Sequence, residues 1–411
     1  MARILAYTSP ARGHLFPLIP ILDELRARGH EVVVRTLASQ VDLARGRGFD
    51  AAAIDPRIER LVHDDWRARN SREGLKAAMR VFNARAEFDA PDLSGAIRDE
   101  DPDAVIVDIN SWGAMAAAER WGSPWAVFCP YPLALRSSQV PPFGPGLAPA
   151  RGPLGRARDA ALRPLVLRTL GNAMLPPLND VRSGLGLPAL RRVDDFFARP
   201  PLLIYLTAEP FEYHRDDWPE NIAMVGPCDW EPPATEPQWL ADVDRPIVLV
   251  TTSSEFQDDG GLVRTALAAL ADQPVHVVAT VPAGDPTAFD VPGNAHVERF
   301  LPHGLLLDRA ACAVTHGGMG ATQKALVRGV PVCVVPHGRD QFEVARRVEV
   351  AAAGTRIPAR RLTTDRLRSG VLQAMTMREG ARRVAAGYAA GGGPAAAASA
   401  VESTLLTSRA M

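Results

Sequence analysis

A histidine near the start of the chain stands where an ionisable side chain could transfer a proton. The apolar run at 3–7 predicts a buried strand, and Gly13 and His14 follow it ahead of Pro17, in the loop that opens a helix. In open α/β sheets ligands bind beyond the carboxyl ends of the strands, so we expect His14 to face a cleft. Because imidazole titrates near neutral pH, His14 is a candidate general base. The alternative interpretation is a histidine that only caps or packs the helix start.

A carboxylate occupies the equivalent place in a later strand. The run AVIVD at 104–108 predicts a buried strand with Asp108 at its carboxyl end. A carboxylate that accepts the second ring N–H of His14 would fix the tautomer of the imidazole and stabilise its charged form. Asp108 could instead cap the next helix, so its catalytic interpretation depends on the pairing with His14.

A glycine-rich turn lies between a predicted strand at 311–315 and a predicted helix at 320–328. It reads His-Gly-Gly-Met-Gly-Ala-Thr from His316. Glycines let a backbone approach a ligand closely, and a helix start presents free N–H groups and the positive end of the helix dipole, which suits a diphosphate. His316 would add a donor. The pattern matches neither GxGxxG nor a P-loop, and a simple tight turn is the alternative.

Polar residues after a further strand point to a sugar rather than to a metal. Asp340 and Gln341 follow the predicted strand at 331–336 and could hydrogen-bond vicinal hydroxyls, with a helix cap as the alternative. None of the nine histidines forms a HExxH pair, no DxD pair ends a predicted strand, and GxSxG is absent. The sequence therefore predicts no metal, no resident cofactor and no serine nucleophile.

Composition narrows the class of protein. The chain has 411 residues, which favours two or three domains, and 47% of them are hydrophobic, enough for full cores. Lys and Arg number 46 against 47 Asp and Glu, a balance that argues against nucleic-acid binding. No apolar run approaches the roughly 20 residues of a membrane helix, and no signal peptide is indicated. The four cysteines are scattered without a CxxC pair, so we expect a cytoplasmic protein without disulfides.

Predicted strands and helices alternate in two sets. The strands are expected at 3–7, 30–36, 104–108, 125–129 and 201–206 in the first set, and at 246–251, 274–281, 295–300, 311–315 and 331–336 in the second. The intervening helices are expected at 17–28, 113–121, 261–271, 320–328 and 341–353. Such alternation predicts an α/β protein with two Rossmann-like parallel-sheet domains facing each other across a cleft.

The domain limits follow from this alternation and from composition. We expect an N-terminal domain at 1–206, a linker at 207–245 rich in Pro, Glu, Asp and Trp, and a C-terminal domain at 246–390. Residues 56–100 and 133–200, with many prolines and arginines, are predicted to be long loops and short helices over the first domain.

Two blocks of sequence resemble a known family. From Arg299 the chain reads RFLPHGLLLDRAACAVTHGGMGATQKALVRGVPVCVVPHGRDQ, and near the start it reads GHLFPLIPILDELRARGHEV. Both resemble the UDP-glycosyltransferase superfamily, especially the bacterial antibiotic and macrolide glycosyltransferases. The resemblance covers both halves and implies the GT-B fold: an acceptor domain, then a nucleotide-sugar domain, then a helix at 391–411 that crosses back to the first domain.

The resemblance also implies roles for individual residues. His14 matches the catalytic base and Asp108 its orienting acid, while Phe300 matches the aromatic position, more often Trp, that stacks on the nucleotide base. The other positions matched to the nucleotide-sugar site are Ser253, Ser254, His316, Gly318, Gly320, Ala321, Asp340 and Gln341.

One position departs from the family pattern. The family commonly has Glu, which holds the ribose hydroxyls, where this chain has Lys324. Lysine cannot accept a hydrogen bond. Either that contact is lost, or the nucleotide lacks the 2′-hydroxyl, as a thymidine-diphosphate (TDP) sugar does, or the donor site is degenerate.

The resulting expectation is an enzyme, an inverting and metal-independent glycosyltransferase. It would move a sugar, expected to be a deoxysugar, from a TDP or UDP donor to a hydroxyl of an apolar natural product such as a polyketide antibiotic. Aromatic residues of the irregular segments are candidates for the acceptor pocket, with ordinary core as their alternative. They are Trp66, Phe82, Trp112, Tyr131 and Phe143, with Phe88, Phe196 and Phe197 as further candidates.

Three other functions stay open at this point. The first is a non-catalytic or auxiliary nucleotide-sugar-binding protein of the same fold, which Lys324 favours and the intact His14 and Asp108 oppose. The others are a GT-B cell-wall lipid glycosyltransferase, which would want an exposed apolar and basic face, and a nucleotide-sugar epimerase. Only small-molecule partners are expected, and the sequence leaves the oligomeric state open.

Overall fold

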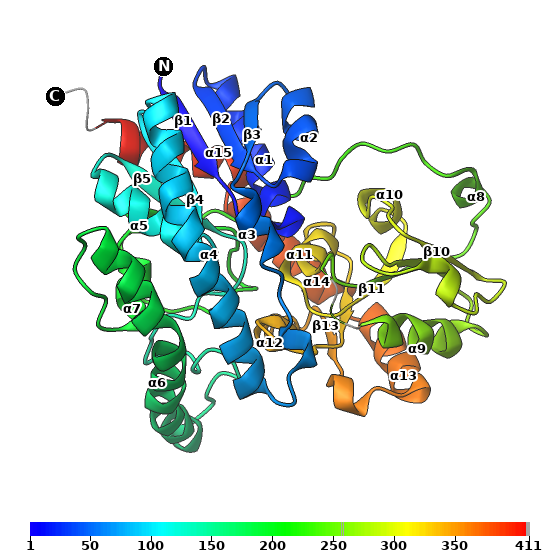
Figure 1. Cartoon of the computed structure of the whole chain (residues 1–411). Coiled ribbons are helices and arrows are strands. Elements are labelled where there is room, and N and C mark those ends of the chain that lie inside the picture. Colours follow the sequence, from blue (N-terminus) through cyan, green and yellow to red (C-terminus); the bar gives the residue numbers. More distant parts are fainter. Residues whose placement is uncertain (256, 258, 408–411) are drawn as a thin grey trace.

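The strands form two wholly parallel sheets in the computed structural model, which describes residues 1–255, 257 and 259–407. The first sheet has seven strands in the order β3-β2-β1-β4-β5-β6-β7, and the second has six in the order β10-β9-β8-β11-β12-β13. In Figure 1 the blue and cyan elements of the first domain lie on the left and the yellow and orange elements of the second on the right. The strand order reverses direction beside β1 and beside β8. These are the places where open α/β sheets bind ligands.

Most strands of the first sheet are the apolar runs from which the sequence predicted them. Its strands are β1 (Arg3–Tyr7), β2 (Glu31–Thr36), β3 (Asp50–Ala53), β4 (Ala104–Asp108), β5 (Trp125–Cys129), β6 (Leu202–Tyr205) and β7 (Ile222–Met224). Every residue of β4, β5 and β6 is buried. Burial on both faces explains why these strands read as continuous hydrophobic runs rather than as alternating patterns.

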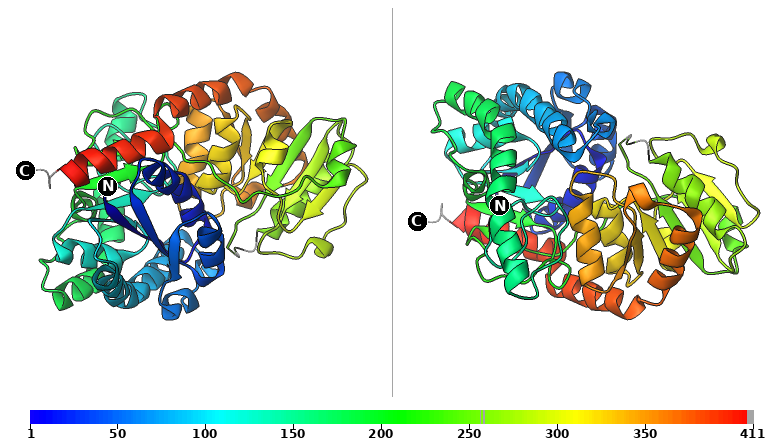
Figure 2. Two further views of the ribbon diagram at one scale, coloured as in Figure 1. Left: turned by 90° about the horizontal axis from the view of Figure 1, so that it is seen from above. Right: turned by 90° about the horizontal axis from the view of Figure 1, so that it is seen from below.

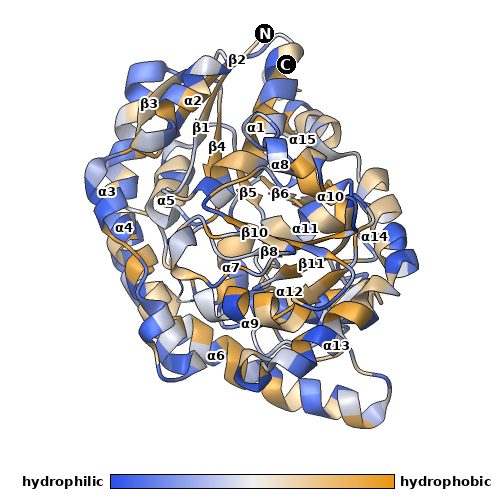
Figure 3. Ribbon diagram, turned by 90° about the vertical axis from the view of Figure 1, so that its right-hand side faces the viewer, coloured by the Kyte–Doolittle hydropathy of each residue, from blue (hydrophilic) through white to orange (hydrophobic). Residues whose placement is uncertain are grey.

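The second sheet repeats the same design. Its strands are β8 (Ile247–Thr251), β9 (His276–Thr280), β10 (Ala295–Glu298), β11 (Ala310–Thr315), β12 (Val332–Val334) and β13 (Gly354–Arg356). Hydrophobic colours follow strands such as β1, β4 and β11 in Figure 3, as a core inside two helical layers requires.

Helices cover both faces of the first sheet. One core packs strand residues against α3 (Pro56–Arg60), α4 (Ser71–Glu100), α5 (Trp112–Trp121), α6 (Pro153–Gly184) and α7 (Val193–Ala198). The opposite core contains residues of α1 (Arg12–Ala27), α2 (Val41–Gly46) and α15 (Gly393–Val401). Short 3₁₀ turns occur at η1 (Ala38–Gln40) and η2 (Asp65–Arg67).

The second sheet is covered in the same way. One core joins it to α8 (Gln238–Ala241), α10 (Gly304–Leu307), α11 (Met319–Val327), α12 (Gln341–Val350) and α14 (Arg378–Ala390). The other core contains α9 (Gly260–Leu270) and α13 (Thr364–Met375). Further 3₁₀ turns are η3 (Pro286–Ala288) and η4 (Ala359–Arg361), and η5 (Glu402–Leu406) is a π-helical turn that follows α15.

The end of the described chain returns to the first domain. Ala397, Ala398 and Val401 of α15 belong to the same core as α1, and Arg28 at the end of α1 pairs with Glu402 at 2.7 Å. Figure 2 shows the red helix lying along the dark blue elements of the first sheet. The last helix therefore fastens the second domain to the first. No helix within residues 1–255, 257 and 259–407 is long and apolar enough to span a membrane.

Two predicted irregular regions are in fact the longest helices. The prediction for 56–100 and 133–200 is wrong, because α4 has 30 residues and α6 has 32. Prolines misled the interpretation: Pro91 lies inside α4, and Pro164, Pro176 and Pro177 lie inside α6. An internal proline removes one backbone hydrogen bond but does not end a helix that tertiary packing holds.

Other helices and strands also differ in their limits from the prediction. α1 begins at Arg12, ahead of Pro17, so His14 lies in the first helical turn rather than in a loop. The segment predicted as linker contains β7, which pairs with β6 and extends the first sheet. Strands β3 and β13 and helices α13 and α14 were not predicted, since they are short or carry charged residues on one face.

Candidate active site

The carboxyl ends of the neighbouring strands β1 and β4 bring His14 and Asp108 together. Nδ1 of His14 lies 2.8 Å from Oδ1 of Asp108. The Asp108 side chain is fully buried, and that of His14 is 15% exposed. The backbone N–H of Ser9 donates to Oδ2 of Asp108 at 2.9 Å, and that of Asn110 donates to Oδ1 at 2.9 Å. The carboxylate is therefore held in place by groups other than the histidine that it orients.

The two side chains shift each other's ionisation. Burial lowers the pKa of His14, but the charge and hydrogen bond of Asp108 outweigh it, so this pKa is raised above the usual value for histidine. Burial raises the pKa of Asp108, yet His14 and the backbone donors outweigh it and the pKa is lowered. Asp340 and Glu255 of the second domain also raise the His14 pKa. Electrostatically, the histidine of one domain thus faces carboxylates of the other.

The other ring nitrogen of His14 also has a neighbour. Nδ2 of Asn110 lies 3.1 Å from Nε2 of His14. The hydroxyl of Tyr131 donates to Oδ1 of Asn110 at 2.8 Å, and the Tyr131 ring centroid lies 5.8 Å from that of His14. Sequence reasoning named Tyr131 only as a pocket wall and missed Asn110, although its place two residues after Asp108 was a usable signal.

The glycine-rich turn of the second domain connects β11 to α11 as predicted. Gly317 has φ +95°, and Gly318 caps the helix. A Cβ on Gly318 would lie 2.5 Å from Nε2 of His316, so the glycine makes room for the imidazole. The first N–H groups of α11, around Gly320 and Ala321, have no partner within the helix. This helix start can therefore accept an anion.

His316 is suited to donate to such an anion. It is 7% exposed, and its Nδ1 has no hydrogen-bond partner within the described chain. Burial lowers the pKa of His316, although the nearby Asp259 opposes this shift. The ring nitrogen beside Gly318 is Nε2, so a neutral imidazole that carries its proton there can add one directed hydrogen bond at the helix start.

Gln341, predicted to contact the donor sugar, is hydrogen-bonded within the protein at both of its polar atoms. Oε1 of Gln341 accepts from the backbone N–H of His337 and Gly338 at 2.8 and 3.1 Å, and Nε2 donates to Gln257 at 2.8 Å. Its polar atoms therefore shape the loop from within the protein. Asp340, at the start of α12, keeps a half-buried carboxylate whose pKa is raised by burial.

The two serines after β8 also differ from each other. The backbone N–H of Ser253 donates to Asp259 at 2.7 Å, and its Oγ accepts from Gln257 at 2.9 Å. Ser253 is buried whereas Ser254 is exposed, so Ser254 is the freer of the two to meet a phosphate. Phe300, after β10, is 49% exposed. Such an exposed ring is available for stacking.

Lys324 faces a carboxylate that sequence reasoning missed. Its Nζ lies 2.7 Å from Oε1 of Glu231, in the connection between the domains. Glu231 also accepts from the backbone N–H groups of His303 and Gly304 at 2.9 and 2.8 Å, in the loop after Phe300. Where the family has Glu, this chain thus has a lysine whose partner carboxylate comes from another segment.

The aromatic candidates for the acceptor pocket separate into groups. Trp112 is 5% exposed and stacks on Phe82 at 5.2 Å between ring centroids, so it belongs to the core rather than to a pocket surface. Trp112 is the first residue of α5 and packs against Phe82 of α4. Trp66 packs on the guanidinium of Arg67 at 4.8 Å. Phe88 lies against the first core, and Phe196 and Phe197 are buried in it.

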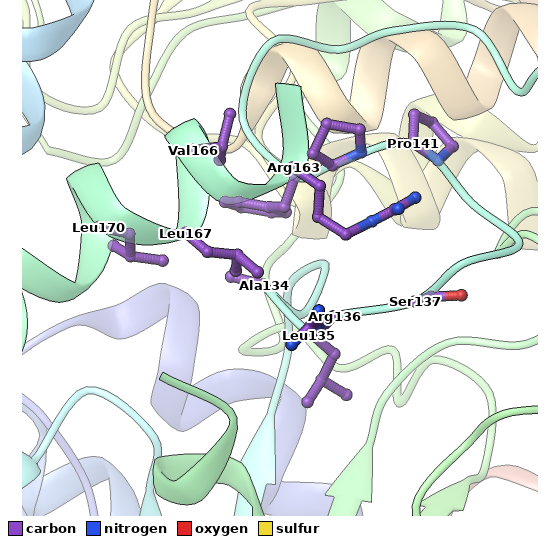
Figure 4. Close-up of a pocket in the computed structure, with 11 residues that line it drawn as sticks. Ala134, Leu135, Arg136, Ser137, Pro141, Arg163, Val166, Leu167 and Leu170 are labelled. Carbon is purple, nitrogen blue, oxygen red and sulfur yellow. The ribbon is translucent and has the colours of Figure 1, made fainter. Parts of the chain in front are cut away.

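Two hollows lie beside Phe143. The first, of about 10 Å³, is lined by residues of the first domain alone, namely 134–137, 141–143 and Arg163, Val166, Leu167 and Leu170 of α6. Figure 4 shows the α6 side chains lying along one side of this space with the loop opposite. The second, also of about 10 Å³, shares Phe143 and reaches Glu343 and Arg347 of α12. Each hollow has room for about one water molecule, and only the second reaches from the first domain to the second.

An arginine that sequence reasoning missed also crosses between the domains. Arg339, beside Asp340, donates to both carboxylate oxygens of Asp65 in η2 at 2.7 and 2.8 Å. It donates to Glu255 of the second domain at 2.9 Å. The arginine fastens the loop of Asp340 to the first domain.

The sequence of the chain is similar to known enzymes. Residues 264–404 match the family described as Erythromycin biosynthesis protein CIII-like, C-terminal domain. Over 389 residues the chain is 33% identical to 4'-demethylrebeccamycin synthase of Lentzea aerocolonigenes, a match that covers 90% of this chain and 91% of the relative. The chain belongs to the family of bacterial antibiotic glycosyltransferases.

One further relative and one solved structure are similar to this glycosyltransferase along nearly its whole length. Oleandomycin glycosyltransferase of Streptomyces antibioticus is 26% identical over 418 residues, which cover 98% of this chain and 91% of the relative. The glycosyltransferase VinC, solved in complex with DTDP, superposes with a TM-score of 0.66 at 22% identity, covering 96% of each chain. The predictions of family, GT-B fold and glycosyltransferase activity are thereby confirmed.

Proposed function

We propose that this glycosyltransferase moves a deoxysugar from a TDP donor to a hydroxyl of an apolar natural product, with inversion and without a metal. The observation that carries the proposal is the His14–Asp108 pair at the carboxyl ends of β1 and β4, within electrostatic reach of Asp340 and Glu255 of the second domain. The proposed base therefore lies on the first domain, and the proposed site for the leaving diphosphate lies on the second.

His14 supplies the base. The acceptor hydroxyl hands its proton to Nε2 of His14 while its oxygen attacks the anomeric carbon on the face opposite the diphosphate. The bond from that carbon to the diphosphate oxygen breaks, and the configuration inverts. Asp108 holds the Nδ1–H group and stabilises the imidazolium. In other enzymes a positioned general base raises the rate by about 10²–10⁴-fold.

The start of α11 supplies the leaving-group site. Charge gathers on the diphosphate as the bond breaks, and the free N–H groups near Gly320 and Ala321 together with His316 would stabilise it. Preorganised donors of this kind each contribute about 3 kcal/mol in other enzymes. Ser254 and Asp340 are proposed to contact the phosphate and the sugar, and Phe300 to stack on the base.

The environment of Lys324 supports TDP over UDP. Lys324 itself offers the ribose no acceptor at the position where the family commonly has Glu. The neighbouring Glu231 carboxylate already accepts from Lys324 at 2.7 Å and from the backbone N–H groups of His303 and Gly304. TDP has no 2′-hydroxyl to satisfy there. The structural neighbour VinC was solved with DTDP, which agrees with this choice.

The acceptor is proposed to enter from the side of Tyr131 and Phe143. Tyr131 borders His14, and Phe143 lines two small hollows, of which the second reaches α12 of the second domain. A mostly apolar wall with a few polar groups suits a polyketide. One relative is named for oleandomycin, and this supports an antibiotic acceptor.

A single assay tests the proposal. The protein is incubated with matched TDP- and UDP-sugars and a panel of polyketide and aromatic alcohols, and free nucleoside diphosphate and glycosylated product are quantified. We expect equal amounts of the two, faster turnover with TDP, and inverted configuration at the anomeric carbon by NMR. Binding of nucleotide without any product would show a nucleotide-sugar-binding protein, and a clear preference for UDP would contradict the TDP assignment.

A further inference from the structure

The nitrogen of His14 that must take a proton is already occupied. Nδ1 of His14 faces Asp108, an acceptor-only carboxylate, so in the neutral ring Nδ1 carries the proton and Nε2 carries the lone pair. Nδ2 of Asn110 lies 3.1 Å from Nε2. An amide N–H that donates to this lone pair must move before any hydroxyl can use it.

Tyr131 fixes the direction of the Asn110 amide. Its hydroxyl donates to Oδ1 of Asn110 at 2.8 Å, which turns the NH₂ group toward His14. Burial raises the pKa of the Tyr131 phenol, so the hydroxyl remains a donor across the working pH range. Tyr131 also packs against the apolar cores of both domains. The amide is thereby held by a residue that the domain arrangement itself positions.

We infer that Asn110 is a positioning residue that keeps water from the His14 base until an acceptor hydroxyl displaces its amide. This inference rests on the proposed glycosyl transfer. It assigns to Asn110 and Tyr131 a control of how donor sugar divides between transfer and hydrolysis.

The competing reaction is balanced and needs no further reactant. Water would attack the anomeric carbon, the bond to the diphosphate oxygen would break, and the water proton would pass to Nε2 of His14. The products are free sugar and nucleoside diphosphate. Because both nucleophiles use the same nitrogen, whatever occupies it decides which of them reacts.

An acceptor can displace the amide more easily than water can. Its hydroxyl donates to Nε2 of His14 and accepts from Nδ2 of Asn110, as a water would. The acceptor adds the binding free energy of its apolar body in the pocket, which water lacks. Binding energy from remote parts of a substrate can drive such a rearrangement at the reacting centre. Asn110 therefore favours the large nucleophile.

The test compares donor consumption with and without acceptor in wild type, Asn110→Ala and Tyr131→Phe. Asn110→Ala retains the backbone N–H that binds Asp108. We expect the ratio of hydrolysis to transfer to rise at least about tenfold in Asn110→Ala, and by a smaller factor in Tyr131→Phe, where the amide keeps its place but loses its orientation. Thermal unfolding of each variant controls for folding.

Asn110→Asp adds a readout that a purely structural role would not move. A second carboxylate at Nε2 of His14 would favour the imidazolium, so the acid limb of the kcat/KM profile should shift to higher pH. An unchanged hydrolysis ratio in Asn110→Ala, or an unmoved acid limb in Asn110→Asp, would overturn the inference while wild-type transfer still supports the proposed function. Absence of transfer in wild type would instead defeat the proposed function.

Discussion

His14 and Asp108 each change what the other can do, and the pH dependence of the reaction should show it. The base must be neutral, and Asp108 raises the pKa of His14 against the effect of burial. The acid limb of kcat/KM therefore lies above the pH at which an ordinary histidine titrates. Asp340 and Glu255 act in the same direction from the second domain.

Asp108→Asn should move that limb. The substitution removes the negative charge and leaves burial, which lowers the His14 pKa, so the acid limb shifts to lower pH. The plateau should also fall by about 10²–10⁴-fold, because the tautomer and the imidazolium lose their support. The measurement compares the pH profiles of kcat/KM of wild type and Asp108→Asn from about pH 5 to 9, a range that covers the titration of histidine. A limb that stays in place would show that Asp108 does not act through His14.

At the scale of elements, the sequence predicts strands better than it predicts helices. β1, β4, β5 and β8 have continuous apolar centres because both faces are covered, and that pattern is visible in the chain itself. The sequence does not predict α4 and α6, because their prolines and charged residues obscure the helical periodicity. Tertiary packing supplies the stability of these helices. β7 is three residues long and gains its place only by pairing with β6.

The same reasoning explains which site residues were predictable. His14, Asp108 and His316 follow strand ends, where topology alone places them at the cleft. Glu231 and Arg339 owe their roles to partners far along the chain, so no local pattern marks them, whereas Asn110 had a local signal in its place two residues after Asp108. The chemistry of strand ends can be read from sequence, whereas the contacts that adjust it need the fold.

The start of α11 yields a prediction about Gly318. Gly318→Ala would place a methyl group 2.5 Å from the His316 imidazole and push the ring aside. We expect the Kd for TDP to rise by about tenfold or more, equal to about 1.4 kcal/mol. Gly46→Ala in α2 is the matched control, since a Cβ there meets nothing within 4 Å. Calorimetric titration with TDP measures both, and equal Kd values would contradict an anion site at this turn.

At the scale of the whole molecule, buried charges join the two domains. Arg347 of α12 donates to Glu212, next to the first sheet, at 2.7 Å and to Glu343 at 2.9 Å, and all three side chains are buried. Glu343 in turn accepts from the backbone N–H groups of Gly144 and Gly146 at 2.8 and 2.9 Å. The arrangement of the domains is therefore specified by charge pairing as well as by α15.

Arg347→Met should destabilise the protein strongly. It leaves two carboxylates buried without their cation, a change that costs about 3–5 kcal/mol in comparable cases. Arg383→Met is the control, because Arg383 is about half exposed and pairs with Glu379 one turn away on α14, where about 0.5 kcal/mol is expected. Urea unfolding measures both free energies. Similar losses in the two variants would contradict a buried network at the interface.

The central claim is that a base on the first domain serves a diphosphate site on the second. The most direct test is His14→Ala, with the transfer rate and the Kd for TDP measured on the same preparation. We predict that kcat falls by about 100-fold or more while the Kd stays within about twofold. A wild-type rate in the variant, or a Kd that weakens as much as kcat falls, would contradict this division of labour.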